Sequence, residues 1–438
     1  MPAFYVCWVS HRSAGIFLMY HKLIVMKKYT TLLLTGLLSI TAVMSCSNDE
    51  KNTEAVENEV LKPAPVTKTN NTKIYMHYMP WFESNESSPE HKWGYHWTMA
   101  NKNPDNMDAN GRREIASHYY PLIGPYHSGD KEVIENHLLM MKYAGVDGIL
   151  IDWYGSFNLN DYRINKENTE QLIEMLDDAG LEYAIVYEDR FLPNIVNAGL
   201  SPTVVSAAKT DFSYLQNNYF NDANYIKVDG KPLLLNFGPI TLTTPADWTN
   251  AFSVLDTKPT FLTLWYESGD AGANASGEYS WVYQDNTHIS NFYANKLPNL
   301  PVAIGSAYPG FNDYYQQGGG GEAIGWTIDH NNGATLDATL AMAKNANLKY
   351  LQLITWNDFG EGTMFEPTVE FGYSYVEKVK AFAGVQNAGV SFTEISKLYN
   401  LRKQYKGNKA IQTKLDKAFE YFAAMQHEKA VQLLNEIK

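Results

Sequence analysis

Two carboxylates three residues apart are the side chains of this sequence best suited to acid–base chemistry. Asp358 and Glu361 stand in the stretch Thr355-Trp-Asn-Asp-Phe-Gly-Glu-Gly-Thr363, directly after the apolar run 350–354. The two glycines of the stretch permit a sharp bend, which could turn both acids toward one cavity. Glycosidic bonds are commonly cleaved by such a pair, one carboxyl group acting as acid and the other as base or nucleophile. Carbohydrate cleavage is therefore our working hypothesis.

The two acids directly follow a predicted strand, which would position them. From Lys73 onward, strand-like runs alternate with helix-like stretches. In the stretch Lys131–Ala144 apolar residues recur at helical spacing, and glycines follow it and Asn168–Ala179 as stop signals. Eight runs are rich in apolar, β-branched and aromatic residues: Ile74–Trp81, Gly148–Tyr154, Glu182–Glu188, Pro232–Phe237, Thr260–Tyr266, Tyr279–Tyr283, Val302–Ala307 and Tyr350–Trp356. The pattern predicts a (β/α)8 barrel over residues 73–375. A helical segment, 376–438, follows, with a hairpin of Ala418–Ala424 and Ala430–Ile437.

Active sites of such barrels lie at the carboxyl ends of the strands, and aromatic and acidic residues gather at the predicted ends. Asp152 could equally be a barrel-end support, and Trp153 and Tyr154 could belong to the core. Glu188 can also form an ion-pair cluster with Asp189 and Arg190. We predict substrate-binding side chains at Tyr78, Trp81, Asp152, Trp153, Tyr154, Glu188, Tyr266, Trp356 and Asn357.

Composition excludes several other classes of function. The formal net charge of −13 argues against a nucleic-acid partner, which requires a basic face. Cys7 and Cys46 are the two cysteines of the chain, so the predicted barrel holds no cysteine metal site and no thiol nucleophile. The histidines lack a His-Glu-x-x-His pattern, which argues against a catalytic metal. Gly318–Gly321 is not followed by Lys-Ser/Thr and is not a phosphate loop.

The amino-terminal segment resembles a secretion signal. Met26-Lys-Lys28 precedes the apolar run 31–40, and Val43-Met-Ser-Cys46 resembles a bacterial lipobox with Cys46 as the lipidated residue. An ordinary secretory signal with an incidental cysteine is the alternative. Residues 1–46 are thus the predicted signal segment, in which 1–25 could be a mis-called extension before Met26.

Residues 47–72 form a polar, acidic stretch, for which we predict a disordered tether. An acidic run directly after a lipidated cysteine also resembles the surface-export signal of Bacteroidetes-type lipoproteins. We expect a protein of the bacterial cell envelope, lipid-anchored and extracytoplasmic, at the outer membrane and the cell surface. The lipid anchor would be its sole contact with the membrane.

Several motifs resemble those of glycoside hydrolase family 99 and its relative, family 71. They occur in the expected order through roughly residues 73–375: Tyr78-Met-Pro-Trp81, His96-Trp97, Tyr120-Pro-Leu-Ile-Gly-Pro-Tyr126, Ala144-Gly-Val-Asp-Gly-Ile-Leu-Ile-Asp-Trp-Tyr-Gly155 and Trp356-Asn-Asp-Phe-Gly-Glu-Gly-Thr363. The resemblance implies a (β/α)8 enzyme that needs neither a metal nor another cofactor. It implies action on α-mannan or α-1,3-glucan, with endo cleavage expected, and it adds His96 and Trp97 to the substrate-binding residues.

The resemblance also assigns roles to the two acids. Glu361 matches the second glutamate of family 99, which implies general acid/base action, whereas Asp358 stands where that family has Glu. Family 71 is similar here, with Asn-Asp-aromatic-Gly-Glu, but lacks the following Gly-Thr. In family 99 the first acid is proposed to deprotonate the sugar 2-hydroxyl with net retention. Activation of water by Asp358, with inversion, is equally open, and so is a structural role for both acids.

Two other functions stay open at this point. One is an exo-acting glycosidase on another sugar, such as xylose or arabinose. The other is a surface glycan-binding lipoprotein that has lost catalysis, although both signature carboxylates are present. The sequence leaves the sugar, the linkage and the oligomeric state undetermined.

Overall fold

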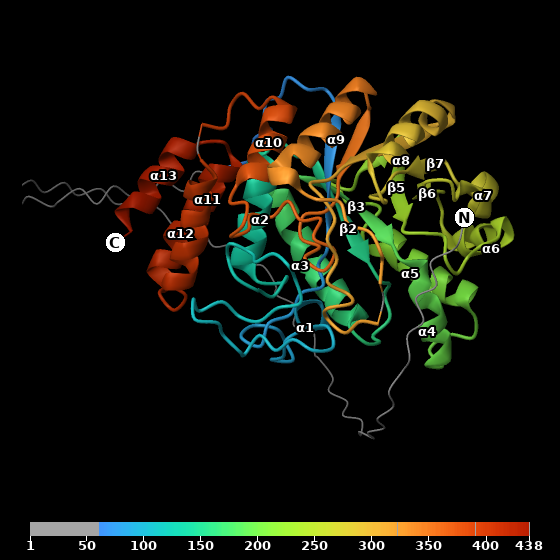
Figure 1. The fold of residues 1–438 in the computed structure, drawn as a ribbon, viewed down its shortest axis with the longest axis horizontal. Helices are drawn as coiled ribbons and strands as arrows, with labels where there is room; N and C mark the ends of the chain where they lie inside the picture. Colours follow the sequence, from blue (N-terminus) through green and yellow to red (C-terminus); the bar gives the residue numbers. More distant parts are fainter. Residues whose placement is uncertain (1–60, 322, 390, 438) are drawn as a thin grey trace, which may run out of the picture. The chain divides into compact units, whose positions relative to one another are not determined.

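The computed structural model describes residues 61–321, 323–389 and 391–437 (Figure 1). Leu61–Lys438 forms one compact unit. The predicted signal segment, with Cys46, and the predicted linker up to residue 60 lie outside the described residues. Among the described helices, none combines the length and the apolar character needed to cross a membrane.

Eight parallel strands close into a barrel, which confirms the predicted fold class. The order around the barrel is β1-β2-β3-β5-β6-β7-β8-β9, and β9 pairs with β1 to complete the ring. The short β4 pairs antiparallel with β5. The strands are β1 Lys73–Tyr78, β2 Gly148–Trp153, β3 Glu182–Tyr187, β4 Lys227–Val228, β5 Lys231–Asn236, β6 Thr260–Leu264, β7 Gly277–Tyr279, β8 Val302–Ala307 and β9 Tyr350–Leu353.

Helices surround the barrel and continue beyond its last strand (Figure 1). They are α1 Tyr95–Thr98, α2 Lys131–Tyr143, α3 Tyr162–Ala179, α4 Leu192–Asn197, α5 Val204–Asn218, α6 Pro245–Ala251, α7 Ser268–Ala271, α8 Asn286–Asn291, α9 Ala334–Asn345, α10 Ser374–Ala383, α11 Phe392–Gln404, α12 Lys409–Ala423 and α13 His427–Glu436. The predicted C-terminal hairpin corresponds to α12 and α13, which both begin before the predicted residues. The predicted helix at Asn168 begins at Tyr162 instead.

The sixth barrel strand lies earlier in the sequence than predicted. The prediction was Tyr279–Tyr283, but β7 is Gly277–Tyr279. A Cβ atom at Gly277 would lie 1.7 Å from the Val302 carbonyl oxygen of β8. The strand therefore needs a glycine where the two backbones approach, and a search for apolar residues alone passes over that position.

Strand register decides which side chains enter the barrel. His77 pairs with Leu150 across β1 and β2, and its Nδ1 lies 3.4 Å from Gln352 Oε1 inside the barrel. Because side chains alternate between the two faces of a strand, Asp152 shares the inner face with His77. Tyr78 and Trp153 therefore point outward, toward the helices.

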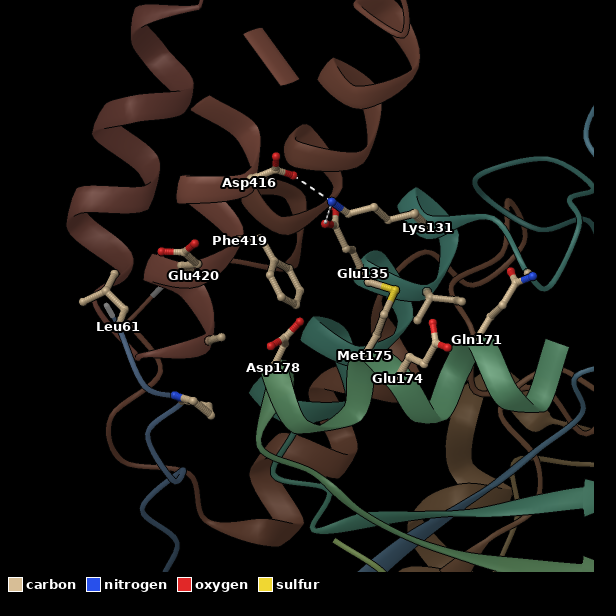
Figure 2. A pocket seen from close by; sticks show the side chains of 14 residues that line it. Leu61, Lys131, Glu135, Gln171, Glu174, Met175, Asp178, Asp416, Phe419 and Glu420 are labelled. Atoms are coloured by element: carbon tan, nitrogen blue, oxygen red, sulfur yellow. Dashed lines mark hydrogen bonds and ion pairs between the residues drawn. The ribbon is translucent and has the colours of Figure 1, made fainter. Parts of the chain in front are cut away.

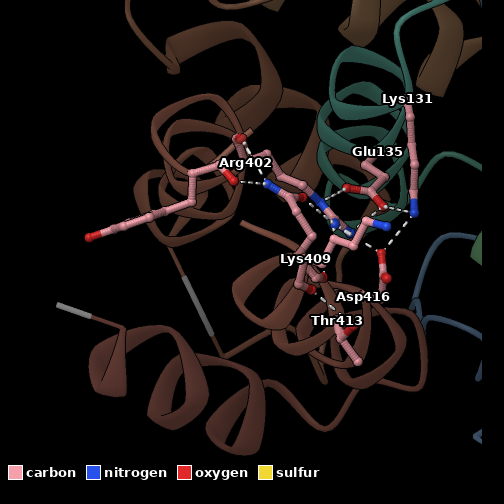
Figure 3. A network of polar contacts seen from close by, with 8 residues as sticks. Lys131, Glu135, Arg402, Lys409, Thr413 and Asp416 are labelled. Carbon is pink, nitrogen blue, oxygen red and sulfur yellow. Dashed lines mark hydrogen bonds and ion pairs between the residues drawn. The ribbon is translucent and has the colours of Figure 1, made fainter. Parts of the chain in front are cut away.

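The C-terminal helices pack against the outside of the barrel, where α11 and α12 contact α2. Arg402 of α11 donates two hydrogen bonds to Glu135 of α2, from Nε to Oε2 at 2.8 Å and from Nη2 to Oε1 at 2.7 Å. Asp416 of α12 lies 2.8 Å from Arg402 and 2.7 Å from Lys131 (Figure 3). This network joins the C-terminal helices to the first barrel helix.

A cavity of about 600 Å³ lies beside this network, between α2, α3 and α12 (Figure 2). Its walls mix apolar and acidic side chains, among them Leu61, Ile134, Met175, Asp178, Phe419 and Glu420. It is on the helical side of the molecule and does not reach the strand ends that carry the acid pair.

Residues 61–72 were predicted to belong to a disordered linker, but they are part of the compact unit. Ala64 N–H donates to Ala423 O at 3.0 Å, and Thr69 N–H donates to Gly384 O at 3.1 Å. Lys68 forms an ion pair with Asp147 at 2.5 Å. These contacts tie the chain before β1 to the C-terminal helices.

Candidate active site

Asp358 and Glu361 lie in one tight turn directly after β9. The Asp358 N–H donates to Thr355 Oγ1 at 2.7 Å, and the Gly362 N–H donates to the Asp358 carbonyl at 3.0 Å. Asp358 Oδ1 accepts the Glu361 N–H at 2.9 Å. The bend predicted from the glycines is thus present. This bond to a backbone amide is the contact expected if Asp358 had a structural role, and it also sets the position of Glu361.

A loop from β8 holds Glu361 from the other side. Tyr315 O–H donates to Glu361 Oε1 at 3.2 Å, and the Asn312 N–H donates to the Glu361 carbonyl at 2.8 Å. Gly362 has φ +67°, and a Cβ there would lie 2.8 Å from Asn312 O. A glycine is therefore required at 362 for both the turn and the close approach of this loop.

The pKa values of the two carboxyl groups differ. Burial, and next the charge of Asp358, raise the pKa of Glu361 well above its usual range. Burial raises the pKa of Asp358 to about 6, while its hydrogen bond from the Glu361 N–H opposes the increase. Glu361 therefore holds its proton to higher pH than Asp358 does. One group is set up to donate a proton and its neighbour to accept one.

A second acidic group lies at the ends of β2 and β3. Burial, and next the charge of Glu188, raise the pKa of Asp152 well above its usual range. Arg190 Nε lies 2.8 Å from Glu188 Oε2, and its guanidinium stands 5.3 Å from the centre of the Phe237 ring. Arg190 also acts on Glu361, since its charge lowers the pKa of that acid. The cation thus interacts with both acidic groups.

Aromatic rings border the same end of the barrel. His96 stacks on Trp81, with ring centroids 4.0 Å apart and planes inclined by 7°. Tyr154 lies 6.1 Å from Trp81, and the carboxylates of Asp152 and Asp358 contribute to its raised pKa after burial, the main cause. His96 also lowers the pKa of Asp358 through its charge. Trp81, His96 and Tyr154 therefore form one cluster, in which His96 and Tyr154 interact electrostatically with Asp358.

Four predicted substrate-binding aromatics belong to the core instead, since none has exposed surface: Tyr78, Trp97, Trp153 and Trp356. Tyr78 O–H and His137 Nδ1 of α2 lie 3.0 Å apart, and Trp153 stacks toward Tyr214 of α5. Tyr78 and Trp153 face the helices because of strand alternation. The Trp97 indole N–H donates to the Tyr126 carbonyl at 2.8 Å, and Trp356 packs edge-on against His137.

Asn357 is also buried, and it anchors the turn that carries the two acids to the residue that follows β1. Its Oδ1 accepts the Met79 N–H at 2.9 Å, and its Nδ2 donates to the Met79 carbonyl at 3.0 Å. Nδ2 also lies 3.1 Å from Tyr126 O–H. The side chain is committed to these contacts, so we correct its predicted role from substrate binding to positioning of the loop.

Tyr266 lies at the end of β6, on the same face of the barrel as the acids, and is 45% exposed. Its ring neighbours include Trp265 and Phe292. The structure brings it to the predicted strand end, but its described neighbours do not include the acid pair.

Two site residues were missed by the sequence analysis. Tyr315 sits in the long loop after β8, next to a glycine run, with no periodic signal to mark it. Arg190 was interpreted as a member of an ion-pair cluster with Glu188 and Asp189. Its effect on Glu361 depends on the closure of the barrel, which brings the ends of β3 and β9 together.

Comparison with known proteins finds similarity to one family of glycosyl hydrolases. The model of glycosyl hydrolase family 99 matches residues 69–258. The GH99 endo-alpha-mannosidase from Bacteroides thetaiotaomicron has the same fold, with a TM-score of 0.55 and 19% identity, over 71% of this chain and 96% of that chain. A glycoside hydrolase-like protein gives a TM-score of 0.54 at 14% identity, over 74% of this chain and 97% of that chain. This chain is therefore similar to family 99 over residues 69–258, which is under half of its length.

Curated relatives align with a smaller share of this chain than the solved structures do. A human glycoprotein endo-alpha-1,2-mannosidase-like protein is 23% identical over 288 residues, which is 58% of each chain. A mouse glycoprotein endo-alpha-1,2-mannosidase is 26% identical over 151 residues, 31% of this chain and 32% of its own length. The chain thus spans under two thirds of these relatives. The family match ends at residue 258, so it does not include Asp358 or Glu361.

Proposed function

We propose that this protein is a glycosidase that cleaves α-mannan-type glycans within the chain. The observation that carries the proposal is the turn after β9, where Asp358 Oδ1 accepts the Glu361 N–H and Glu361 holds its proton to higher pH than Asp358. Hydrolysis of a glycosidic bond needs one carboxyl group that donates a proton and a second that acts as base or nucleophile. The family match and the endo-mannosidase names of the relatives support an α-mannoside rather than another sugar.

In the proposed reaction Glu361 donates its proton to the glycosidic oxygen as the bond to the anomeric carbon breaks. Asp358 accepts a proton from the group that attacks that carbon, either a water molecule or the sugar 2-hydroxyl. Tyr315 holds the Glu361 carboxyl in place. Glu361 must regain its proton before the next cycle, and partial exposure gives it access to water.

The second acidic group would bind the sugar. Among the described residues, the buried Asp152 Oδ2 has no hydrogen-bond partner, and a sugar hydroxyl could supply one. Arg190 offers donors beside it, since its guanidinium has five N–H groups and Glu188 takes only part of them. Trp81, His96 and Tyr154 would contact the apolar faces and edges of the ring.

Product analysis on a panel of α-linked polymers and oligosaccharides tests this function. We expect hydrolysis of α-mannan with the early release of oligosaccharides of several lengths, detected by chromatography. Release of single sugars alone would support the exo-acting alternative and would contradict endo cleavage. Binding of a polymer without release of reducing ends would instead favour the non-catalytic glycan-binding protein.

Activity should follow a bell-shaped pH profile. Because burial raises the pKa of Asp358 to about 6, kcat/KM should rise with pH through that region as Asp358 ionises. At higher pH kcat/KM should fall, because Glu361 loses the proton that it must donate. The measurement is hydrolysis of the best α-linked substrate from about pH 4 to 10. An activity that stays constant across pH 6, or that peaks below it, would contradict this assignment.

A further inference from the structure

The end of β6 presents a tyrosine in an unusual backbone conformation. Tyr266 has φ +68°, in the left-handed region that bulky residues rarely adopt, and it is 45% exposed. Such a conformation persists only where the surrounding structure holds it, and these positions cluster at binding and catalytic sites. The conformation and the exposure together call for a physical explanation.

A buried carboxylate fixes this conformation. Glu278 of β7 has no exposed surface, and its Oε2 accepts the Tyr266 N–H at 2.8 Å. Its Oε1 accepts the Ser268 N–H at 3.3 Å and lies 2.9 Å from Lys296 Nζ. Both oxygens of this acid are thus used to shape the loop after β6 and to pair with one lysine.

The Tyr266 ring is supported on part of its surface only. Lys296 Nζ stands 5.6 Å from the ring centre, and Phe292 packs edge-on with centroids 6.1 Å apart and an 81° interplanar angle. Trp265 lies 6.1 Å away between ring centroids, and 45% of Tyr266 is exposed. A rigid ring of this kind, held by a cation and an aromatic neighbour, offers an apolar surface at small entropic cost to a ligand.

The ring lies on the barrel face that carries the acids, and a neighbouring loop connects the two regions. Leu264 N–H of β6 donates to Gly238 O at 2.9 Å, which joins the end of β6 to the loop after β5. That loop begins with Phe237, which carries the Arg190 guanidinium on its face, and continues to Ile240, which is 43% exposed. Tyr266 and Ile240 are thus exposed at two adjoining strand ends, and Phe237 of the second loop contacts Arg190.

We propose that Tyr266 is the platform of a distal sugar subsite, which stacks on the apolar face of a pyranose ring in a glycan chain that extends beyond the acid pair. The inference rests on the proposed function for its ligand class. Glu278 and Lys296 are positioning residues, because they hold the loop and the ring. In the competing interpretation the ring only shields the Glu278–Lys296 ion pair from water, and Tyr266 then has no effect on glycan binding.

Affinity electrophoresis of the full chain in gels containing soluble α-mannan, and in parallel α-glucan, tests the subsite without requiring turnover. The informative variant is Tyr266→Asn, because Asn tolerates the left-handed conformation and removes the ring. Tyr266→Phe is the matched control that keeps the ring. We expect retardation of the wild-type protein by at least one polymer, an about tenfold weaker apparent affinity for Tyr266→Asn, and unchanged affinity for Tyr266→Phe.

Absence of retardation of the wild-type protein, or equal retardation of wild type and Tyr266→Asn, overturns the inference. Tyr266→Gly, which also accepts positive φ, replaces the Asn variant if thermal unfolding shows that the latter does not fold. Hydrolysis of a short α-linked oligosaccharide by the wild-type protein, measured in parallel, separates the subsite from the proposed function. If the wild-type protein binds polymer through Tyr266 but hydrolyses nothing, the proposed function fails while the subsite stands.

Discussion

Replacement of Glu361 by Gln is expected to reduce kcat for an α-linked oligosaccharide by about 10²–10⁴-fold, the usual contribution of a positioned general acid. Gln keeps the size of the side chain and can still accept the Tyr315 hydrogen bond, but it has no proton to donate. Substrate affinity should change little, because the sugar-binding groups stay in place. The measurement is steady-state release of reducing ends by the purified variant.

Glu377→Gln is the matched control, since it is the same substitution at an exposed position in α10. It should leave kcat and KM at wild-type values. A Glu361→Gln variant with unchanged turnover would remove Glu361 from the mechanism. A loss of folding, seen in the thermal unfolding curve, would show that its role is structural.

Replacement of Arg402 by Leu is expected to lower the free energy of unfolding by about 3–5 kcal/mol, the range found when one partner of a buried ion pair is removed. Glu135 is 2% exposed and would be left with Lys131, 3.7 Å away, as its nearest cation. The same change removes the link between α11, α12 and α2 (Figure 3). The midpoint of urea unfolding measures the effect.

The double variant Arg402→Leu with Glu135→Leu serves as the control. Replacing a buried ion pair by apolar residues is often neutral, so the second change should restore a large part of the lost stability. Additive losses from the two single changes would contradict this explanation. They would indicate that the packing of the side chains, and not their charges, holds the C-terminal helices.

The barrel could be predicted from sequence because its strands are buried on both faces and read as apolar runs at regular intervals. β7 was the exception, since close contact with β8 requires Gly277 where the search expected a large apolar residue. The contacts of residues 61–72 with Ala423 and Gly384 could not be predicted from the sequence either. They join parts of the chain more than 300 residues apart in sequence, and composition carries no sign of such a contact.

The acid pair was also visible in the sequence, because its spacing and its glycines are local features. The assignment of aromatic residues was less successful. Tyr78 and Trp153 follow strand alternation and face the helices, so the alternation rule, applied to the predicted strands, would have excluded both. The role of Asn357 depends on Met79, and that of Tyr315 on Glu361. Both require the folded barrel and could not be predicted from spacing.

The measurement that tests the central claim most directly compares two substrates of the Glu361→Gln variant. An α-glycosyl fluoride carries a leaving group that needs no proton, whereas an oligosaccharide of the same sugar does. If Glu361 is the general acid, the variant should hydrolyse the fluoride within about tenfold of the wild-type rate. Its rate of oligosaccharide hydrolysis should fall by about 10²–10⁴-fold. Equal losses on both substrates, or no loss on either, would contradict the assignment of Glu361 as the proton donor.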